Sequence, residues 1–396
     1  MPEGLSVLMI NDYRPESPRA GGAEMVMRTT QEGLGARGVR TNRWTSEDLP
    51  GHTRTAPSYL HNKAACTSLR ERLAVDKPDV VHLHNFYHEL SPAILRVLAD
   101  WKDQSPGRRV VMTAHDFHLA CPHSGLTYYA AGRPIATSAE QCRSLPYLLS
   151  RCWDRRGLAH GTLKLAQHIW SYRIRKLSRS IDLCICPSAF MAAQLRAARL
   201  PVRVLSNIAP APIETAPRPE GPLAMVFAGR IEPEKGLLNF LRDVPDSAAW
   251  TLDVIGAGEQ MKECEDAVRR RGFSSRVRWC GKLPHTEVIG RITRADVLVL
   301  PSVWPENQPL VMLEALAAGA WPLTPDLGGM REIVEESGCG TLYEPGNRES
   351  LAAAVEELAK KKADGLLSRA DASQYLRSRG EKQYFESLLR IYRGET

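Results

Sequence analysis

Apolar and polar positions alternate in blocks along the whole chain. Short apolar runs rich in Val, Ile and Leu recur, and most are followed by a stretch with the spacing of an amphipathic helix. Such runs predict strands at 5–11, 80–84, 109–115 and 182–188, and again at 223–229, 250–256, 276–281, 296–302 and 320–326. Continuous apolar strands that alternate with helices are typical of parallel sheets covered by helices on both faces. The pattern therefore predicts an α/β fold with two parallel sheets.

A proline-rich stretch divides the two halves. The segment "NIAPAPIETAPRPEGP", from Asn207 to Pro222, contains five prolines and has no apolar periodicity, which is typical of a semi-rigid linker. At 396 residues the chain is also long for one hydrophobic core. We therefore predict a first domain over 1–207, a linker over 208–222 and a second domain over 223–375.

One region of the first domain breaks the alternation. Residues 140–181 have a helical pattern, many basic side chains and several Trp and Tyr residues, so they read as an insertion. Its basic residues are Arg151, Arg155, Arg156, Lys164, Arg173, Arg175, Lys176 and Arg179. A basic helical segment can bind an anionic membrane surface, and it can equally be a solvated helix face.

The composition narrows the classes of partner and compartment. A net charge of +7 favours anionic partners, but the chain contains no recognisable nucleic-acid-binding module, so we expect no nucleic acid partner. No apolar run is long enough to span a membrane, and the N-terminal segment lacks the basic start of a signal peptide. These features predict a cytoplasmic protein, with peripheral membrane contact through 151–179 as the open question.

The cysteines do not follow the pattern of a disulfide framework. There are nine, an odd number, and a pair such as Cys184 and Cys186 lies within a predicted buried strand. One region also contains a set of thiol and imidazole side chains without any standard C-x2-C spacing, namely His118, Cys121, His123, Cys142 and Cys152. We expect these to be packing residues and assign no metal, although their side chains leave metal binding open.

Candidate chemistry follows the predicted strands, because ligands of open α/β sheets bind beyond the carboxyl ends of the strands. Gly21 and Gly22 come after the first strand and lead into a helix, where backbone N–H groups can approach a phosphate or a sugar. A simple turn is the alternative. His115 and Asp116 stand at the end of another strand, which favours function over a structural role.

A second group of candidates lies in the second half. The loop "AGRIEPEKG" places Arg230 and Lys235 after a strand, where two cations suit a diphosphate, although a solvated turn has the same composition. The segment "VIGAGEQ" offers Gly256 and Gly258 but lacks the third glycine of a dinucleotide fingerprint. A nicotinamide cofactor is therefore not expected.

Two carboxylates stand out in the apolar stretch "PSVWPENQPLVMLEALAAGA". Proline is tolerated at the start of a helix, so a helix is predicted to begin at about Pro309. Glu306 then lies in the preceding loop and Glu314 in the second turn. The alternative is that Glu306 interacts favourably with the helix dipole and that Glu314 is a solvated helix position, in which case neither acid has a role in function.

These motifs together resemble glycosyltransferase family 4. The stretch "PSVWPENQPLVMLEALAAGAWPLTPDLGGMREIVEESGCGTLYEPG" resembles the family's C-terminal signature, with a Glu-x7-Glu motif at Glu306 and Glu314. "GGAE", "HD", "SNI" and "AGRIEPEKG" occur in the family's order, so the resemblance spans nearly the whole chain. It implies the GT-B architecture, in which two Rossmann-like domains face a cleft and a C-terminal helix, here 376–396, crosses back to the first domain. It also implies sugar transfer from a nucleotide diphosphate donor with retention of configuration, without a cofactor or bound metal.

The resemblance also implies roles for individual residues. Arg230 and Lys235 would clamp the donor diphosphate and stabilise its developing charge, and His115 would contact the donor sugar at the reacting centre. Glu306 would hold sugar hydroxyls and Glu314 the ribose. Backbone groups would assist from Gly21 and Gly22 and from the helix start at Asn307, Gln308, Pro309 and Leu310. The reaction would be a front-face displacement through an oxocarbenium-like state.

Two departures leave the donor open. The family often has Glu-Gly-Phe-Gly where this chain has "ENQP", and Asn-Gly where it has Asn207 and Ile208. UDP and GDP are the nucleotides we expect, and the acceptor would be a glycan, a lipid-linked sugar or a small molecule in polysaccharide, lipid-linked glycan or glycoside biosynthesis. A nucleotide-sugar epimerase, a phosphorylase or a non-catalytic sugar-nucleotide-binding subunit are the alternative functions.

Overall fold

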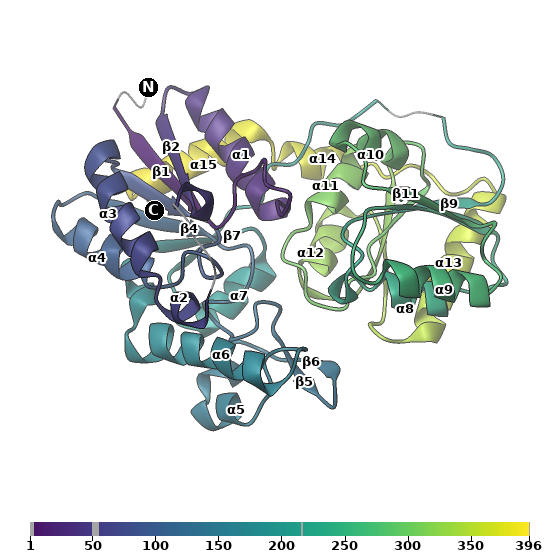
Figure 1. Cartoon of the computed structure of the whole chain (residues 1–396). Coiled ribbons are helices and arrows are strands. Elements are labelled where there is room, and N and C mark those ends of the chain that lie inside the picture. Colours follow the sequence, from purple (N-terminus) through teal and green to yellow (C-terminus); the bar gives the residue numbers. More distant parts are fainter. Residues whose placement is uncertain (1–3, 50–54, 215–216, 396) are drawn as a thin grey trace. The chain divides into compact units, whose positions relative to one another are not determined.

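The computed structural model describes residues 4–49, 55–214 and 217–395, and these form two compact units. The first unit comprises residues 1–207 and 381–396, and the second comprises residues 208–380 (Figure 1). Each unit is built around one parallel sheet.

The first unit contains a six-stranded sheet in the order β2-β1-β3-β4-β7-β8, in which every neighbouring pair is parallel. Its strands are β1 (Ser6–Asn11), β2 (Arg40–Thr45), β3 (Val80–Leu83), β4 (Arg109–Thr113), β7 (Leu183–Cys186) and β8 (Val202–Val204). The apolar runs predicted four of them. The sequence pattern missed β2 and β8, because both are edge strands with polar or half-exposed residues.

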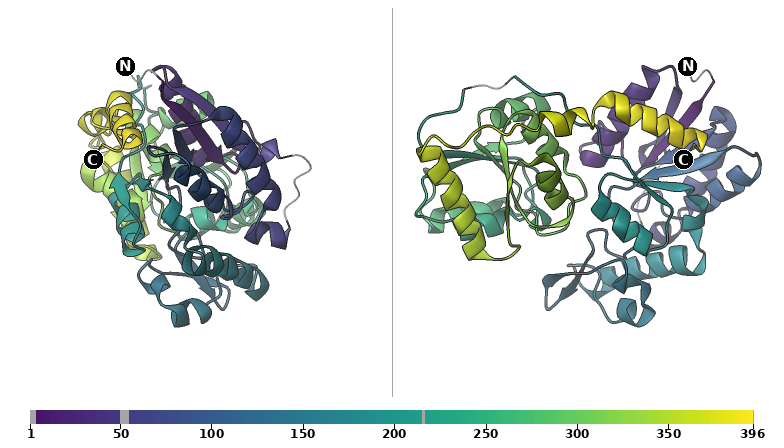
Figure 2. Two further views of the ribbon diagram at one scale, coloured as in Figure 1. Left: turned by 90° about the vertical axis from the view of Figure 1, so that its left-hand side faces the viewer. Right: turned by 180° about the vertical axis from the view of Figure 1, so that it is seen from behind.

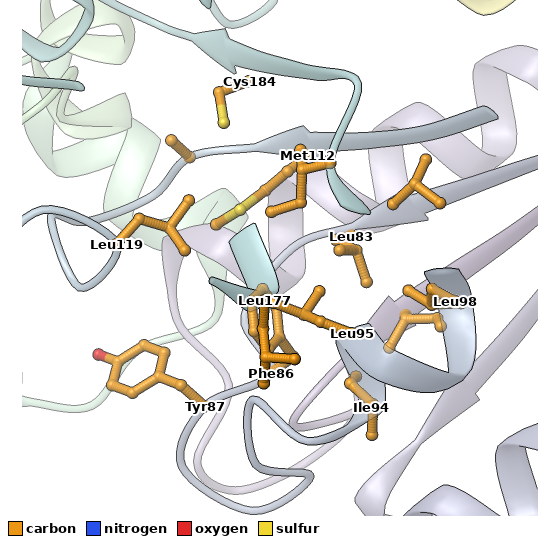
Figure 3. Close-up of a cluster of buried hydrophobic side chains, with 14 of the residues drawn as sticks. Leu83, Phe86, Tyr87, Ile94, Leu95, Leu98, Met112, Leu119, Leu177 and Cys184 are labelled. Atoms are coloured by element: carbon orange, nitrogen blue, oxygen red, sulfur yellow. The ribbon is translucent and has the colours of Figure 1, made fainter. Parts of the chain in front are cut away.

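Helices cover both faces of this sheet. They are α1 (Gly22–Gly35), α3 (Lys63–Asp76), α4 (Ile94–Asp103), α7 (Ala189–Ala197) and α15 (Glu381–Arg393). The short helix α2 (Ala56–Leu60) contacts α6 (Leu158–His168) instead. Figure 3 shows part of the buried core, in which Leu83 and Met112 of the central strands pack with Leu95 and Leu98 of α4. The alternation of strand and helix thus arises from burial on both faces of the sheet.

The predicted insertion is largely helical, as expected, but a β-hairpin precedes it. The hairpin strands are β5 (Thr127–Ala130) and β6 (Arg133–Ala136), and the helices are α5 (Leu145–Leu149) and α6 (Leu158–His168), followed by a π-helical segment (Ile169–Ile174). Trp153 is buried beneath them and donates a hydrogen bond from its indole Nε1 to the Leu148 carbonyl at 2.8 Å. The insertion therefore has its own small core.

The C-terminal helix α15 packs on the first unit, as the family resemblance implied, and lies along it in yellow in Figure 2. Tyr384 shares a hydrogen bond of 3.2 Å with Thr30 of α1. Phe385 lies so close to Gly33 that a Cβ there would be 2.0 Å from the ring. A glycine on α1 therefore makes room for the returning helix.

The second unit repeats the architecture with a parallel sheet in the order β11-β10-β9-β12-β13-β14. Its strands are β9 (Leu223–Ala228), β10 (Trp250–Ile255), β11 (Val277–Gly281), β12 (Val297–Val299), β13 (Trp321–Pro325) and β14 (Thr341–Tyr343). One face carries α8 (Leu237–Asp243), α9 (Met261–Arg270) and α13 (Arg348–Ala363). The other carries α10 (His285–Ile292), α11 (Leu310–Ala317), α12 (Gly328–Ser337) and α14 (Ser373–Arg377). The apolar runs predicted every strand except the short edge strand β14.

The proline-rich segment belongs to the second unit. The Ile213 N–H donates to the Ala317 carbonyl at 2.7 Å, and the Ala209 N–H donates to the Arg379 carbonyl at 3.0 Å. Arg218 donates to the Gly319 carbonyl at 2.9 Å and lies 3.3 Å from the buried carboxylate of Asp296. Its described residues are thus held by the second unit.

Candidate functional site

Lys235 and Glu306 form an ion pair at the carboxyl edge of the second sheet. Lys235 ends a short 3-10 turn (Pro233–Lys235) after β9, and Glu306 lies in the loop after β12. The Lys235 Nζ is 2.6 Å from the Glu306 Oε1, and only 18% and 12% of the two side chains are exposed. The topology thus joins two motifs that lie about seventy residues apart in the sequence.

Two further donors reach the same carboxylate oxygen. The Ser302 hydroxyl donates to Glu306 Oε1 at 2.7 Å, and the Trp304 indole donates at 3.1 Å. Lys235, Ser302 and Trp304 therefore all donate a hydrogen bond to Oε1, and none of the three donates one to Oε2. Ser302 and Trp304 were not predicted as site residues, because nothing in their residue types distinguishes them from other residues of the loop that can donate a hydrogen bond.

The charge of Glu306 is fixed by these partners. Burial alone raises the pKa of the Glu306 carboxyl, but the positive charge of Lys235 and the three hydrogen bonds outweigh it and hold the pKa below its usual value. An ionised carboxylate only accepts hydrogen bonds. Glu306 is therefore suited to bind hydroxyl groups through its second oxygen.

Glycines bring the loops around Glu306 into direct contact. Gly236, with a φ of +68°, lies so close to the Pro301 carbonyl that a Cβ would be 1.9 Å from its oxygen. At the start of α12, a Cβ on Gly329 would be 1.5 Å from the Asn307 carbonyl oxygen. The Gly329 N–H also donates to the Glu306 carbonyl at 2.8 Å. The carboxylate is thus positioned by backbone contacts that only glycine permits.

Gly256 and Gly258, which did not fit a dinucleotide motif, have the same packing role. A Cβ on Gly256 would be 1.9 Å from the Gly229 carbonyl oxygen, and one on Gly258 would be 2.3 Å from the Ile231 carbonyl oxygen. They hold the loop after β10 against the loop that carries Arg230. Close backbone approach explains them without a cofactor.

Helix α11 begins at Leu310 with Pro309 before it, which confirms the predicted helix start. Glu314 lies in this helix, and its Oε1 is 2.8 Å from the Nε2 of His285 at the start of α10. His285 is 62% exposed, whereas Glu314 is 17% exposed. Glu306 and Glu314 thus have different partners. His285 was missed, since a single histidine outside any motif carries no sequence signal.

Arg230 differs from Lys235 in its surroundings. It is exposed and forms no ion pair with another residue in the described part of the chain. Both cations follow β9, but only Lys235 is already neutralised by a carboxylate. Arg230 is therefore the cation of this loop whose charge is available to an anionic ligand.

In the first unit, Gly21 and Gly22 lie at the start of α1, as predicted. The Gly21 N–H, however, donates to the carboxylate of Glu24 at 2.8 Å, and the side-chain amide of Asn11 donates to the same carboxylate at 2.8 Å. The space beside Gly22 is open, because a Cβ there would have no neighbour within 4 Å. The Gly21 amide is thus occupied within its own helix start.

His115 and Asp116, expected as a pair, contact different groups. Asp116 accepts hydrogen bonds from the Tyr87 hydroxyl at 2.8 Å and pairs with the Nδ1 of His118 at 2.7 Å. The His115 Nε2 instead lies 2.9 Å from the Nδ1 of His84, which follows β3. Burial lowers the pKa of His115 to about 4, so its imidazole is neutral near neutral pH. The rule that selected His115, a polar residue at a strand end, applies equally to His84.

The cysteines are all free thiols, and Cys121 and Cys142 are buried. Within the residues that the structure describes, no group of three or more His, Cys, Asp and Glu side chains is arranged to hold a metal ion. The described helices include none that is both long and apolar enough to cross a membrane.

Comparisons with protein families identify the chain's family. Residues 213–379 match the family described as "Glycosyl transferases group 1", and residues 20–209 match "Glycosyltransferase Family 4". The two matches lie on the two units and meet near the boundary between them. The chain belongs to glycosyltransferase family 4, as its motifs predicted.

Curated relatives match parts of the chain. Glycogen synthase of Mycobacterium tuberculosis is 35% identical over 142 residues, which are 35% of this chain and 34% of that protein. The 2-deoxystreptamine glucosyltransferase of Streptomyces kanamyceticus is 29% identical over 205 residues, which are 47% of this chain and 52% of that protein. The chain spans about a third to a half of the length of these relatives.

Solved structures match the whole chain. Sucrose-phosphate synthase from Thermosynechococcus elongatus aligns with a TM-score of 0.71 at 16% identity and covers 98% of both chains. HepE of Anabaena, solved in complex with UDP and glucose, aligns with a TM-score of 0.62 at 17% identity over 98% of this chain and 99% of its own. These matches and the two parallel sheets confirm the predicted GT-B fold class.

Proposed function

We propose that the protein is a retaining glycosyltransferase that transfers a sugar from a nucleotide diphosphate donor to an acceptor hydroxyl. The observation that carries the proposal is the Glu306 carboxylate, which is held ionised by Lys235 while its Oε2 takes none of the three bonds on Oε1. This acid stands at the first position of the Glu-x7-Glu motif of its family. A fixed acceptor of this kind suits the hydroxyl groups of a sugar.

Further residues of the second unit supply the remaining functions of a donor site. Glu306 Oε2 accepts hydroxyls of the donor sugar, and Glu314 accepts the ribose hydroxyls after exchange of its contact with His285. Arg230 stabilises the charge that develops on the leaving diphosphate, which is the largest catalytic effect expected of such a site. Lys235 adds positive charge there while it keeps Glu306 ionised. Backbone N–H groups at the start of α11 assist.

His115 contributes a neutral imidazole to the same reaction. Its low pKa means that it carries no proton to donate as an acid near neutral pH. It therefore donates a hydrogen bond to the donor sugar at the reacting centre, or accepts one from it. We propose no protein nucleophile, and the leaving phosphate takes the acceptor's proton in a front-face displacement.

Donor binding is the first test. Calorimetric titration of the full chain with UDP, GDP, ADP and dTDP should show binding of one nucleotide, and UDP is the first choice because the similar HepE structure contains UDP. Lack of binding to all four would contradict the proposal. Incubation with the matching nucleotide sugar and candidate acceptors then separates a transferase from an epimerase or a non-catalytic subunit, which would bind the donor without forming a glycoside.

The insertion supports a second part of the proposal, contact with an anionic membrane that holds a lipid-linked acceptor. Along α6 and the π-helical segment, positions four residues apart are all exposed, and they include Leu158, Trp170 and Ile174. Arg155, Arg175 and Lys176 flank them and are also exposed. An exposed apolar row beside cations is the arrangement with which a helix binds an anionic lipid surface.

A further inference from the structure

Three histidines form a packed array beside the carboxyl end of the first sheet. The rings of His84 and His115 are stacked with centroids 5.1 Å apart, and those of His82 and His84 are stacked at 4.6 Å. His82 is anchored by the Tyr392 hydroxyl of α15 at 2.7 Å and by the Thr113 hydroxyl at 2.8 Å. The array thus extends from the returning C-terminal helix to His115.

The rings of this array are neutral near neutral pH. Burial lowers the pKa of His82 to about 3 and that of His115 to about 4, and it lowers the pKa of His84 well below its ordinary value. A neutral imidazole has one N–H donor and one acceptor nitrogen. The contact of 2.9 Å between His84 Nδ1 and His115 Nε2 therefore requires that one of these two nitrogens carries its hydrogen and the other does not.

The Nε2 atom of His84 indicates whether the shared hydrogen lies on His84 Nδ1 or on His115 Nε2. His84 Nε2 is buried and has no hydrogen-bond partner among the described residues. A buried N–H group without a partner is rarer in proteins than an acceptor without one, so this nitrogen is the bare acceptor. The hydrogen of His84 then lies on Nδ1 and is donated to His115 Nε2.

The hydrogen of His115 consequently lies on Nδ1. This atom is not one of the fully buried polar atoms that lack a partner, and no hydrogen bond joins it to a described residue, so part of its surface is accessible in the half-buried ring. A histidine in water prefers the opposite tautomer, with its hydrogen on Nε2. The environment of the ring therefore selects the less common form.

We propose that His84 is a positioning residue that fixes His115 as its Nδ1–H tautomer, so that His115 presents an N–H donor to an oxygen of the donor sugar. The inference about the sugar rests on the proposed transferase function, whereas the tautomer itself does not. His115 then stabilises the sugar by a hydrogen bond in the transition state and transfers no proton. His82 and Tyr392 hold His84 in place by stacking and by their hydrogen bond.

The tautomer can be measured directly on the full chain without any ligand. Long-range correlation spectra of protein with ¹⁵N-labelled histidine at pH 7 distinguish a protonated from a bare nitrogen in each ring, and the His115→Gln variant assigns the signals of His115. We expect a protonated Nδ1 and a bare Nε2 in the wild-type protein. A protonated Nε2 on His115 would overturn the proposal whether or not the protein transfers sugar.

Two substitutions of His84 test the cause. His84→Asn keeps an N–H donor near the position of Nδ1 and should preserve the tautomer, whereas His84→Leu removes the donor and should return His115 to the Nε2–H form. If His115 keeps its Nδ1–H form in a folded His84→Leu variant, His84 does not set it. Thermal unfolding of each variant confirms the fold.

Kinetics of sugar transfer provide the second readout. His84→Leu should lower kcat about tenfold with a smaller change in KM, because a hydrogen bond made in the transition state is lost, and His84→Asn should recover most of kcat. A purely structural role would instead lower stability in both variants together. Equal loss of kcat in both variants would contradict the proposal. If no transfer is detected with any donor, the proposed function fails, and the spectra still decide the tautomer.

Discussion

At the scale of single residues, the ion pair between Lys235 and Glu306 fixes the position of the Glu306 carboxylate and keeps it ionised. Buried charges are stable only when they are paired. Removal of one partner leaves the other as an uncompensated buried charge, which is strongly destabilising. Both residues were predicted from their motifs. Their contact was not, because Lys235 was expected to bind only the diphosphate.

We expect Glu306→Gln to lower the turnover of sugar transfer by about 10²-fold or more, since the neutral amide loses the charge directed at the sugar hydroxyls. Ser302→Ala is the matched control, because it removes one bond to the same oxygen and keeps the charge. It should cost less, about ten- to a hundredfold, in line with the loss of one hydrogen bond to a charged group. Initial rates at saturating donor measure both. A Glu306→Gln variant with near-wild-type turnover would refute the site.

Lys235→Ala should lower turnover by orders of magnitude and change the pH dependence. Burial raises the pKa of Glu306, and the charge of Lys235 contributes to lowering it below its usual value. Without Lys235, the pKa of Glu306 therefore rises, and the acid limb of the rate profile moves to higher pH. Arg230→Ala should also reduce turnover but leave the acid limb in place, since Arg230 is not among the partners that lower the pKa of Glu306. An acid limb unchanged in Lys235→Ala would contradict this account.

At the scale of elements, glycines determine where the loops after the strands can lie. Gly329 at the start of α12 and Gly236 before α8 let two loops approach the backbone around Glu306. The sequence contained these glycines within a family motif, but which backbone each one faces depends on strand order. The order places β9 between β10 and β12, so residues distant in the chain become neighbours.

We expect Gly329→Ala to destabilise the second unit by about 1–3 kcal/mol, because its Cβ would overlap the Asn307 carbonyl. The matched control is Gly290→Ala in α10, where a Cβ meets nothing within 4 Å. That change should be neutral or stabilise by up to about 1 kcal/mol through helix propensity. Urea unfolding followed by tryptophan fluorescence measures both. Equal stability of the two variants would show that the contact with Asn307 has no energetic weight.

At the scale of the whole molecule, the chain uses one architecture twice and adds a basic insertion to the first unit. The returning helix α15 closes the first unit through its contacts with α1 and with His82. The insertion adds exposed apolar and basic side chains that the core of the unit does not need. These exposed side chains are the basis for the predicted membrane contact.

We expect the protein to bind vesicles that contain phosphatidylglycerol and not vesicles of phosphatidylcholine alone. Substitution of Arg155, Arg175 and Lys176 by Glu should abolish binding, since each cation contributes about 1 kcal/mol near an anionic surface. The double substitution Trp170→Ala and Ile174→Ser should weaken binding to these vesicles. Val75→Ser, an exposed apolar position outside the insertion, is the control. Co-sedimentation measures binding, and retained binding after charge reversal would exclude this surface.

The sequence by itself determined the two parallel sheets, the boundary near residue 207 and the motif residues, because buried strands and glycine-rich loops leave local patterns. It did not reveal the edge strands β2, β8 and β14 or the hairpin β5–β6, since short or exposed strands lack a continuous apolar run. Only the tertiary structure decided the partners: Glu306 with Lys235, Glu314 with His285, and His115 with His84. Each pair joins loops from different strands, and the order of strands in a sheet, rather than the local sequence, sets which loops meet.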